Sequence, residues 1–87
     1  LHLASISGNL QLAKLLIKKG ANLNVQTNDN GTFPLFVALF QGHFEVAKLL
    51  IEAGANVNLK TTDNGSTALF LVAHRGYSEM VQLLLQK

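Results

Sequence analysis

Metal binding and acid–base catalysis are the two kinds of chemistry that the histidines and carboxylates of this 87-residue chain could support. These side chains are His2, His43, His74, Asp29, Glu45, Glu52, Asp63 and Glu79. A metal site or an acid–base pair needs such groups to converge on one small cavity. Their spacing brings no set of them together, since each histidine falls at a different place in the repeated pattern described below. The sequence also has no cysteine, no glycine-rich phosphate loop and no serine nucleophile motif, so we expect no metal, no cofactor and no enzymatic activity.

Structural roles account for most of these residues. Asp29 and Asp63 each stand before Asn-Gly in a polar run, where a short acceptor side chain favours a tight turn. Glu45 and Glu79 fall in the first turn of predicted helices, where a negative charge interacts favourably with the helix dipole. His2 is expected to be a hydrogen-bonded structural residue.

The composition argues against nucleic-acid and membrane partners. Seven basic and five acidic side chains leave a net charge of +2 without a basic block. Lys14, Lys18, Lys19 and Lys48 gather on the outer side of predicted helices, but no aromatic platform for stacking bases accompanies them. The longest apolar run, "PLFVALF", is far shorter than the ~18 residues of a membrane-spanning helix. The lack of cysteine fits a reducing compartment, so we expect an intracellular protein, cytoplasmic or nuclear.

All of these residues belong to a repeat. The segments "LHLA", "LFVA" and "LFLV" begin at Leu1, Leu35 and Leu69, which gives a period of 34 residues. The seven glycines follow the same period and indicate backbone positions that need conformational freedom. Repetition at a fixed spacing predicts stacked units, because each unit covers its hydrophobic face with the next one.

Each unit is predicted to contain two antiparallel helices. The segment 34–41, "PLFVALFQ", is apolar on almost every side and predicts a short buried helix with Pro34 in its first turn. The segment 44–53 alternates apolar and polar residues at helical spacing and predicts a second, amphipathic helix. Gly20 and Gly54 follow second helices and suit left-handed C-terminal caps.

Polar segments connect the units. Residues 25–33 and 59–67 each contain Asp-Asn-Gly, which predicts a tight turn and therefore a hairpin-like finger. Between the fingers we expect a partial repeat over 1–24, a complete repeat over 34–58 and a second partial repeat over 68–87. The chain would then be one domain.

The repeated segments resemble a known family. "GHFEVAKLLIEAGANVN" resembles the second helix and following loop of an ankyrin repeat, and "GTFPLF" and "GSTALF" resemble the start of its first helix. The resemblance extends over the whole chain, 1–87, and implies a fragment of an ankyrin-repeat domain. The expected fold class is thus an all-α repeat solenoid in which stacked antiparallel helix pairs are joined by β-hairpin-like fingers.

The chain departs from the family pattern at several positions. Its period exceeds the usual length of about 33 residues, and we place the extra residue at Thr27 and Thr61. Phe36 stands where the family has a histidine, while Thr67 keeps the family threonine without that partner, so Thr67 is expected to bond elsewhere or remain solvated. Val72 replaces an alanine of the other copies, which predicts looser packing or a small shift in the third unit.

The resemblance also implies where a partner protein would bind. In ankyrin repeats the finger tips and the exposed ends of the first helices form a concave face. By position, the candidate protein-binding residues are Ile6, Ser7, Gln26, Asp29, Asn30, Thr32, Phe40, Gln41, Lys60, Asp63, Asn64, Ser66, His74 and Arg75. Phe40 has two open interpretations, an exposed apolar anchor or a residue packed under its finger, and Arg75 either anchors a partner or pairs with Asp63.

Two functions from different classes follow from this interpretation. The first is a non-catalytic protein–protein interaction module that recognises its partner through the concave face. The alternative is a passive scaffold or assembly segment of a longer ankyrin solenoid attached to a catalytic or effector domain. Because the chain begins and ends inside a repeat, self-association through open repeat ends is a further expectation. Asn24 and Asn58 resemble asparagines that some ankyrin repeats offer to a hydroxylase, but we favour backbone hydrogen bonding in a turn, which by itself explains a short asparagine there.

Overall fold

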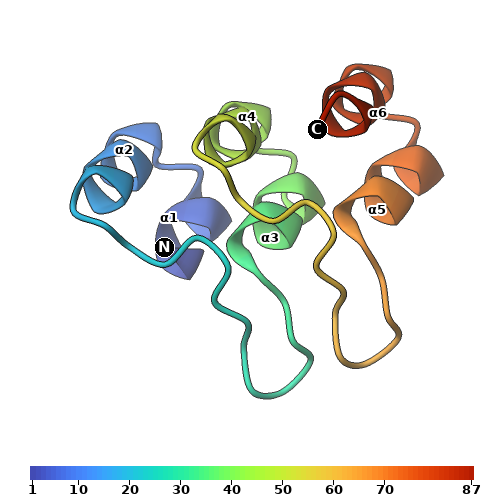
Figure 1. Cartoon of the computed structure of the whole chain (residues 1–87), viewed down its shortest axis with the longest axis horizontal. Coiled ribbons are helices and arrows are strands. Elements are labelled where there is room, and N and C mark those ends of the chain that lie inside the picture. Colours follow the sequence, from blue (N-terminus) through green and yellow to red (C-terminus); the bar gives the residue numbers. More distant parts are fainter.

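The computed structural model describes residues 1–87 and contains six α-helices and no strand. The helices are α1 (His2–Ser7), α2 (Leu10–Lys18), α3 (Pro34–Phe40), α4 (Phe44–Glu52), α5 (Ala68–Arg75) and α6 (Ser78–Leu85). Figure 1 shows α1, α3 and α5 in one layer and α2, α4 and α6 in the other, with the three helix pairs side by side in chain order. The predicted repeat solenoid is confirmed. None of the helices is both long and apolar enough to cross a membrane.

Local capping explains where the helices begin. Pro34 occupies the first turn of α3, as predicted, where its missing N–H leaves no hydrogen bond unmade. Asn9 caps α2 through its Oδ1, which accepts from the backbone N–H of Leu12 over 3.0 Å. Thr67 has found a new partner, because its Oγ1 accepts from the N–H of Phe70 over 3.1 Å and caps α5.

Left-handed glycines follow two helices of the second layer, α2 and α4. The helix α4 ends at Glu52, one residue before the predicted end, and Gly54 follows with a φ of 99°. Gly20 has a φ of 86° after α2. Both values lie in the region that favours glycine, so the predicted caps are confirmed.

The core runs between the two helix layers and is centred on α3 and α4. Its largest fully buried side chains include Phe33, Leu35, Leu39 and Leu50. Val72 is completely buried within the core cluster, and the looser packing or small shift expected around it stays a prediction. The burial of apolar side chains between units is what stabilises a repeat protein of this size.

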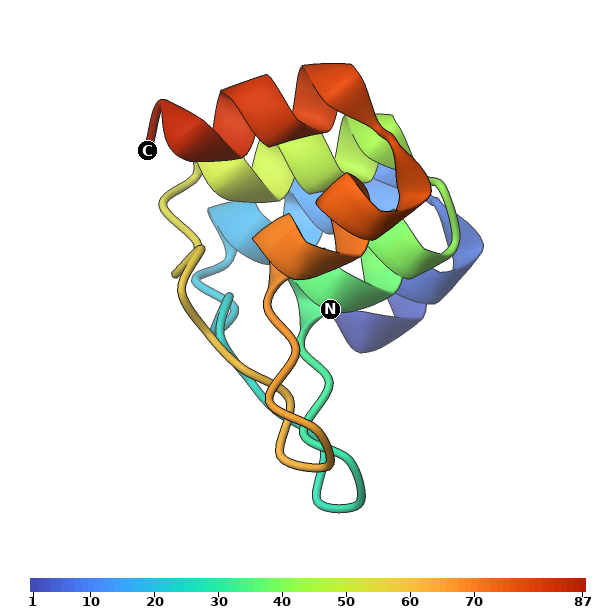
Figure 2. The ribbon, with the colours of Figure 1, turned by 90° about the vertical axis from the view of Figure 1, so that its right-hand side faces the viewer.

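The two fingers project together to one side of the helices (Figure 2). In each finger one backbone N–H spans the turn, from Thr27 to the carbonyl of Thr32 and from Thr61 to the carbonyl of Ser66, both over 2.9 Å. The threonine hydroxyls strengthen the same turns, because Thr27 Oγ1 donates to Asn30 Oδ1 and Thr61 Oγ1 makes the equivalent bond, each over 2.9 Å. Thr27 and Thr61 thus close their fingers, which resemble hairpins in shape without forming strands.

Hydrogen bonds between the fingers fix their relative position. The backbone N–H of Thr62 donates to the carbonyl of Asn30 over 2.9 Å. Gln26 Nε2 donates over 2.8 Å to the carbonyls of both Gly31 and Lys60. The second finger therefore has a defined register on the first.

Candidate protein-binding groove

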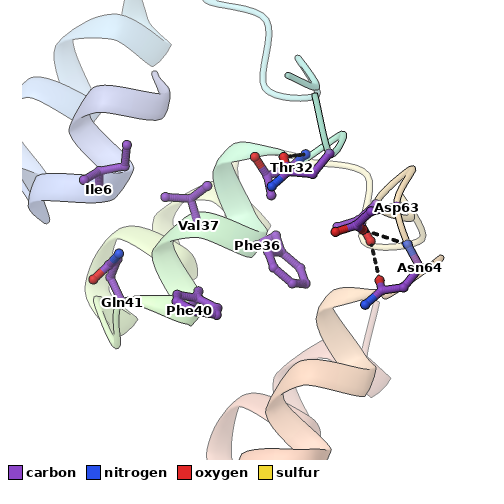
Figure 3. Close-up of a pocket in the computed structure, with 10 residues that line it drawn as sticks. Ile6, Thr32, Phe36, Val37, Phe40, Gln41, Asp63 and Asn64 are labelled. Atoms are coloured by element: carbon purple, nitrogen blue, oxygen red, sulfur yellow. Dashed lines mark hydrogen bonds between the residues drawn. The ribbon is translucent and has the colours of Figure 1, made fainter. Parts of the chain in front are cut away.

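An open groove of about 410 Å³ lies between the fingers and the layer of first helices. Its walls come from α1, α3 and both fingers, and Figure 3 shows the side chains that line it, with Ile6, Phe40 and Asp63 among those labelled. The lining residues are Ile6, Asn30, Thr32, Phe36, Val37, Phe40, Gln41, Thr61, Asp63 and Asn64. Three successive parts of the chain thus contribute to one surface.

A row of three aromatic rings runs from Phe33, just before α3, through Phe36 to Phe40, and the last two line the groove. Phe33 is buried and meets Phe36 edge to face, with 5.6 Å between ring centroids. Phe36 in turn stacks on Phe40 at 6.4 Å with an interplanar angle of 23°. Aromatic pairs at these distances contribute beyond the area that they bury. The row leads from the core to the surface, where half of the Phe40 side chain is exposed.

Arg75 holds Phe40 from the neighbouring repeat. Its Nη1 donates to the backbone carbonyl of Phe40 over 2.6 Å, and its Cζ lies 4.5 Å from the centroid of the Phe40 ring. A guanidinium at this distance interacts favourably with the ring face. The alternative pairing of Arg75 with Asp63 is therefore wrong for this structure. Phe40 is likewise not covered by its finger but remains half exposed beside Arg75.

Asp63 and Asn64 form the polar end of the groove. The N–H of Asn64 donates to Asp63 Oδ1 over 2.7 Å. Asn64 Oδ1 accepts three bonds, from Thr61 Oγ1 and from the backbone N–H and hydroxyl of Ser66. Because its oxygen is fully used, the side-chain amide of Asn64 is fixed in orientation. Asp63 is exposed and is the one ionisable side chain among the lining residues.

Asp29 makes the same turn one repeat earlier but lies outside the groove. Its Oδ1 accepts from the N–H of Asn30 over 2.8 Å, which confirms the predicted turn role. The Thr27 hydroxyl and then the Asn30 N–H hold the pKa of the Asp29 carboxyl below its usual value of 3.8. The dipole of a nearby O–H or N–H group favours the charged form of a carboxylate.

The groove brings together about half of the residues that the sequence nominated. Inside it are Ile6, Asn30, Thr32, Phe40, Gln41, Asp63 and Asn64. Outside its lining are Ser7, Gln26, Asp29, Lys60, Ser66, His74 and Arg75. Some of the outside residues have structural partners instead: Ser7 Oγ donates to the carbonyl of Leu3 over 3.0 Å, and His74 stacks on Phe70 with 5.9 Å between ring centroids.

Sequence reasoning missed Phe36, Val37 and Thr61 as lining residues. A signal for Phe36 was present, because a residue four positions before Phe40 lies on the same face of a helix. The comparison with the family pattern, in which Phe36 replaces a histidine, does not reveal this role. Thr61 carried no comparable signal, since its equivalent Thr27 does not line the groove.

Two of the three histidines, His2 and His43, connect neighbouring segments through backbone carbonyls. His2 Nε2 lies 3.0 Å from the carbonyl oxygen of Thr32, and His43 Nε2 lies 3.0 Å from that of Ile6. The structural role predicted for His2 is confirmed. No three of the histidine and carboxylate side chains come close enough together to hold a metal ion.

An asparagine also links successive repeats. Asn24 Oδ1 accepts from the backbone N–H of Asn56 over 2.8 Å. The N–H of Asn58 donates to Asn56 Oδ1 over 2.9 Å. Backbone bonding thus accounts for the side chain of Asn24, although its partner lies in the next repeat and not in its own turn.

Comparison with known proteins agrees with this architecture. A family model described as ankyrin repeats (3 copies) matches residues 1–87. A curated relative, the ankyrin repeat and SOCS box protein 3 of Bos taurus, is 58% identical over 38 residues. That match covers 44% of this chain and only 7% of the bovine protein, so the chain spans a small part of the length of this relative. Since the family match extends over the whole chain, the chain belongs to the ankyrin-repeat family.

Proposed function

We propose that this chain is a non-catalytic protein–protein interaction module that recognises a partner protein through the face formed by its fingers and first helices. Ankyrin repeats are generally protein-interaction modules and are typically non-catalytic. In this proposal the face is shared by the partial repeat 1–24, the repeat 34–58 and the partial repeat 68–87. The observation that carries the proposal is the groove, at whose surface Phe40 is half exposed and held in place by Arg75.

Burial of apolar surface supplies the driving force. Ile6 and Phe40 are each half exposed and line the same groove. Covering such side chains contributes about 25 cal/mol for each Å² of apolar surface removed from water. Aromatic and arginine side chains are also the ones that most often dominate binding energies, and here Phe40 and Arg75 lie in contact.

The groove is also held in shape before a partner arrives. Phe40 is fixed between Phe36 and Arg75, and Gln26 ties the two fingers together. A surface that is ordered in advance loses less conformational entropy on binding. Such rigidity favours recognition of one defined shape.

The test is capture of partners by the intact, affinity-tagged protein, compared with variants of two surfaces. Phe40→Ala with Arg75→Ala alters the groove and its clamp. Gln11→Ala with Lys14→Ala alters exposed positions on the outer helix α2 and is the control. We expect partners captured by the unchanged protein to be lost with the first pair and retained with the second. Equal capture by both pairs would contradict the proposed face.

The exposed apolar ends of the solenoid favour a second candidate function. Leu3 and Leu15 are 71% and 51% exposed at the first repeat, and Phe70 and Leu85 are 60% and 67% exposed at the last. Ile51, at the position of Leu85 one repeat earlier, is only 3% exposed. We infer that such ends can take further repeats, so that the chain acts as a passive segment of a longer ankyrin assembly.

Sedimentation velocity over a range of concentrations tests this alternative. Stacking through the ends predicts oligomers that grow with concentration and disappear when Leu85→Lys places a charge at the exposed end. A monomer at every concentration would count against self-association through the ends.

A further inference from the structure

We propose that the groove takes an extended segment of a partner protein that carries an uncharged apolar side chain close to a lysine or arginine. The apolar side chain would lie on Phe36 and Phe40, and the cation would pair with Asp63. This inference rests on the binding face proposed above and names the chemistry of its partner.

Asp63 gives the groove its charge preference. It is the one ionisable side chain among the lining residues, and the charge of Arg75 is already engaged by the carbonyl and ring of Phe40. A carboxylate offers about four acceptor positions, of which the N–H of Asn64 uses one. The remaining positions are free for a charge-assisted hydrogen bond, which is stronger than a neutral one.

The aromatic end of the groove suits an uncharged side chain. The guanidinium of Arg75 already lies 4.5 Å from the centroid of the Phe40 ring. A second cation beside this ring would be repelled by Arg75. An aliphatic or aromatic side chain meets no such repulsion and removes the exposed surface of Phe40 from water. The two ends of the groove thus select different side chains.

The polar residues of the groove favour an extended backbone over a helix. Figure 3 shows Gln41 beside Phe40 at one end and Asn64 beside Asp63 at the other, with Phe36 between them in this view. Asn64 uses its side-chain oxygen within the finger, which leaves its amide N–H groups as donors. An extended segment has backbone carbonyls available to such donors, whereas the carbonyls within a helix are already bonded.

The chain supplies a matched control for the charge. Asp29 and Asp63 occupy equivalent turns and accept the same backbone hydrogen bond, yet only Asp63 lines the groove. Both are exposed. Replacing either by asparagine removes one negative charge and keeps an oxygen that can accept the turn hydrogen bond. A difference in peptide affinity between the two variants therefore measures the contribution of a negative charge inside the groove.

The experiment measures binding of fluorescent synthetic peptides to the intact protein at low ionic strength by fluorescence anisotropy. The probes place one leucine and one arginine in a glycine–serine peptide, with a spacer of varied length. In matched probes glutamate replaces the arginine or serine replaces the leucine. The proteins are the unchanged chain, Asp63→Asn, Asp29→Asn and Phe36→Ala.

We expect at least one leucine–arginine spacing to bind the unchanged protein, and Asp63→Asn to weaken it about fivefold, the upper end for an accessible ion pair. Asp29→Asn is expected to change the affinity by less than about twofold because its charge lies outside the groove. Phe36→Ala should weaken leucine–arginine binding and leave the serine–arginine probe unaffected. If Asp63→Asn does not fold, comparing the arginine and glutamate probes on the unchanged protein tests the charge preference of the groove instead.

Three results would overturn the inference: equal effects of Asp63→Asn and Asp29→Asn, equal binding of arginine and glutamate probes, or no binding at any spacing. Displacement of the probe by a second copy of the chain, with dimers that Phe40→Ala abolishes, would assign the groove to self-association and also overturn it. None of these results decides the proposed function, which fails only if the groove variants capture partners as well as the control pair does. The two failures are thus distinguishable.

Discussion

The side chain of Arg75 reaches back to the preceding repeat and binds Phe40 twice. Its Nη1 donates to the Phe40 carbonyl over 2.6 Å, and its Cζ lies 4.5 Å from the centroid of the Phe40 ring. One residue at the end of α5 thus both caps the end of α3 and fixes the aromatic side chain that the binding proposal depends on.

The first prediction concerns this clamp. Arg75→Ala should lower the free energy of unfolding by about 1 kcal/mol, since an exposed cation–aromatic contact and a hydrogen bond to a charged donor are both lost. Lys19→Ala, which removes an exposed basic side chain on the opposite layer, is expected to have little effect. Urea unfolding followed by circular dichroism measures both. Equal stability of the two variants would show that the clamp contributes nothing measurable.

The second prediction uses a pair of equivalent glycines. Gly8 and Gly42 have φ values of 72° and 78°, so alanine is strained at both by about 1–2 kcal/mol. At Gly8 an added Cβ would also lie 2.5 Å from Nδ1 of His43, whereas at Gly42 it would meet nothing within 4 Å. Gly8→Ala should therefore destabilise the protein by about 1 kcal/mol more than Gly42→Ala, because the His43 ring must move away from Ile6.

Thermal unfolding of both glycine variants, each also made with His43→Ala, measures this difference. Removing the imidazole should reduce the extra cost of Gly8→Ala, since the ring is the group that the new Cβ meets. An extra cost that is unchanged by His43→Ala would place its cause elsewhere.

The third prediction concerns a buried hydroxyl. Ser5 is completely buried in α1, and its Oγ has no hydrogen-bond partner. A buried polar group without a partner costs about 1–3 kcal/mol of desolvation. Ser5→Ala should therefore leave the free energy of unfolding unchanged or raise it by about 1 kcal/mol. Urea unfolding measures this change in stability. The reverse change, Ala13→Ser, places a hydroxyl at another fully buried position and serves as the comparison. A loss of stability in Ser5→Ala would indicate that the hydroxyl is bonded in solution.

The fourth prediction is a pH dependence at the first finger. The Thr27 hydroxyl and the Asn30 N–H lower the pKa of Asp29 in the folded state relative to its usual value of 3.8. The folded state then binds fewer protons than the unfolded one, so this contribution to stability is present above pH 3.8 and is lost as the pH falls through the lower folded value. Asp29→Asn should remove this part of the acid sensitivity.

The measurement is the urea midpoint at pH values above and below 3.8 for the unchanged protein and for Asp29→Asn. Glu52→Gln, which removes an exposed carboxyl on α4, serves as the control. Because Asp29 is exposed, the effect should be small and weaker at high salt. Identical acid sensitivity of the unchanged protein and Asp29→Asn would contradict the hydrogen-bond explanation.

The helices could be predicted from the sequence because local signals determine them. The predicted segment 34–41 became the helix Pro34–Phe40, and 44–53 became Phe44–Glu52. Both end within one residue of the prediction, since a glycine that adopts a positive φ follows soon after. Repetition strengthened these predictions, because each signal occurred more than once.

The groove was only partly predictable, since it depends on contacts between repeats. The position of Arg75 suggested an exposed anchor or a partner for Asp63, and the period does not reveal that its side chain points back to Phe40. Thr27 and Thr61 look alike in the sequence, but only Thr61 lines the groove. Such differences arise because equivalent residues contact different neighbouring segments in each repeat. The sequence period does not show which segments those are.

The most direct test of the binding face is site-specific photo-crosslinking of the intact protein in its own cells. A photoreactive residue would replace Gln41, which lines the groove, or Gln11, which is exposed on the outer helix α2. The account predicts that a partner protein cross-links from position 41, that Phe40→Ala abolishes this product, and that position 11 gives none. A partner that cross-links from position 11 and not from position 41 would contradict it.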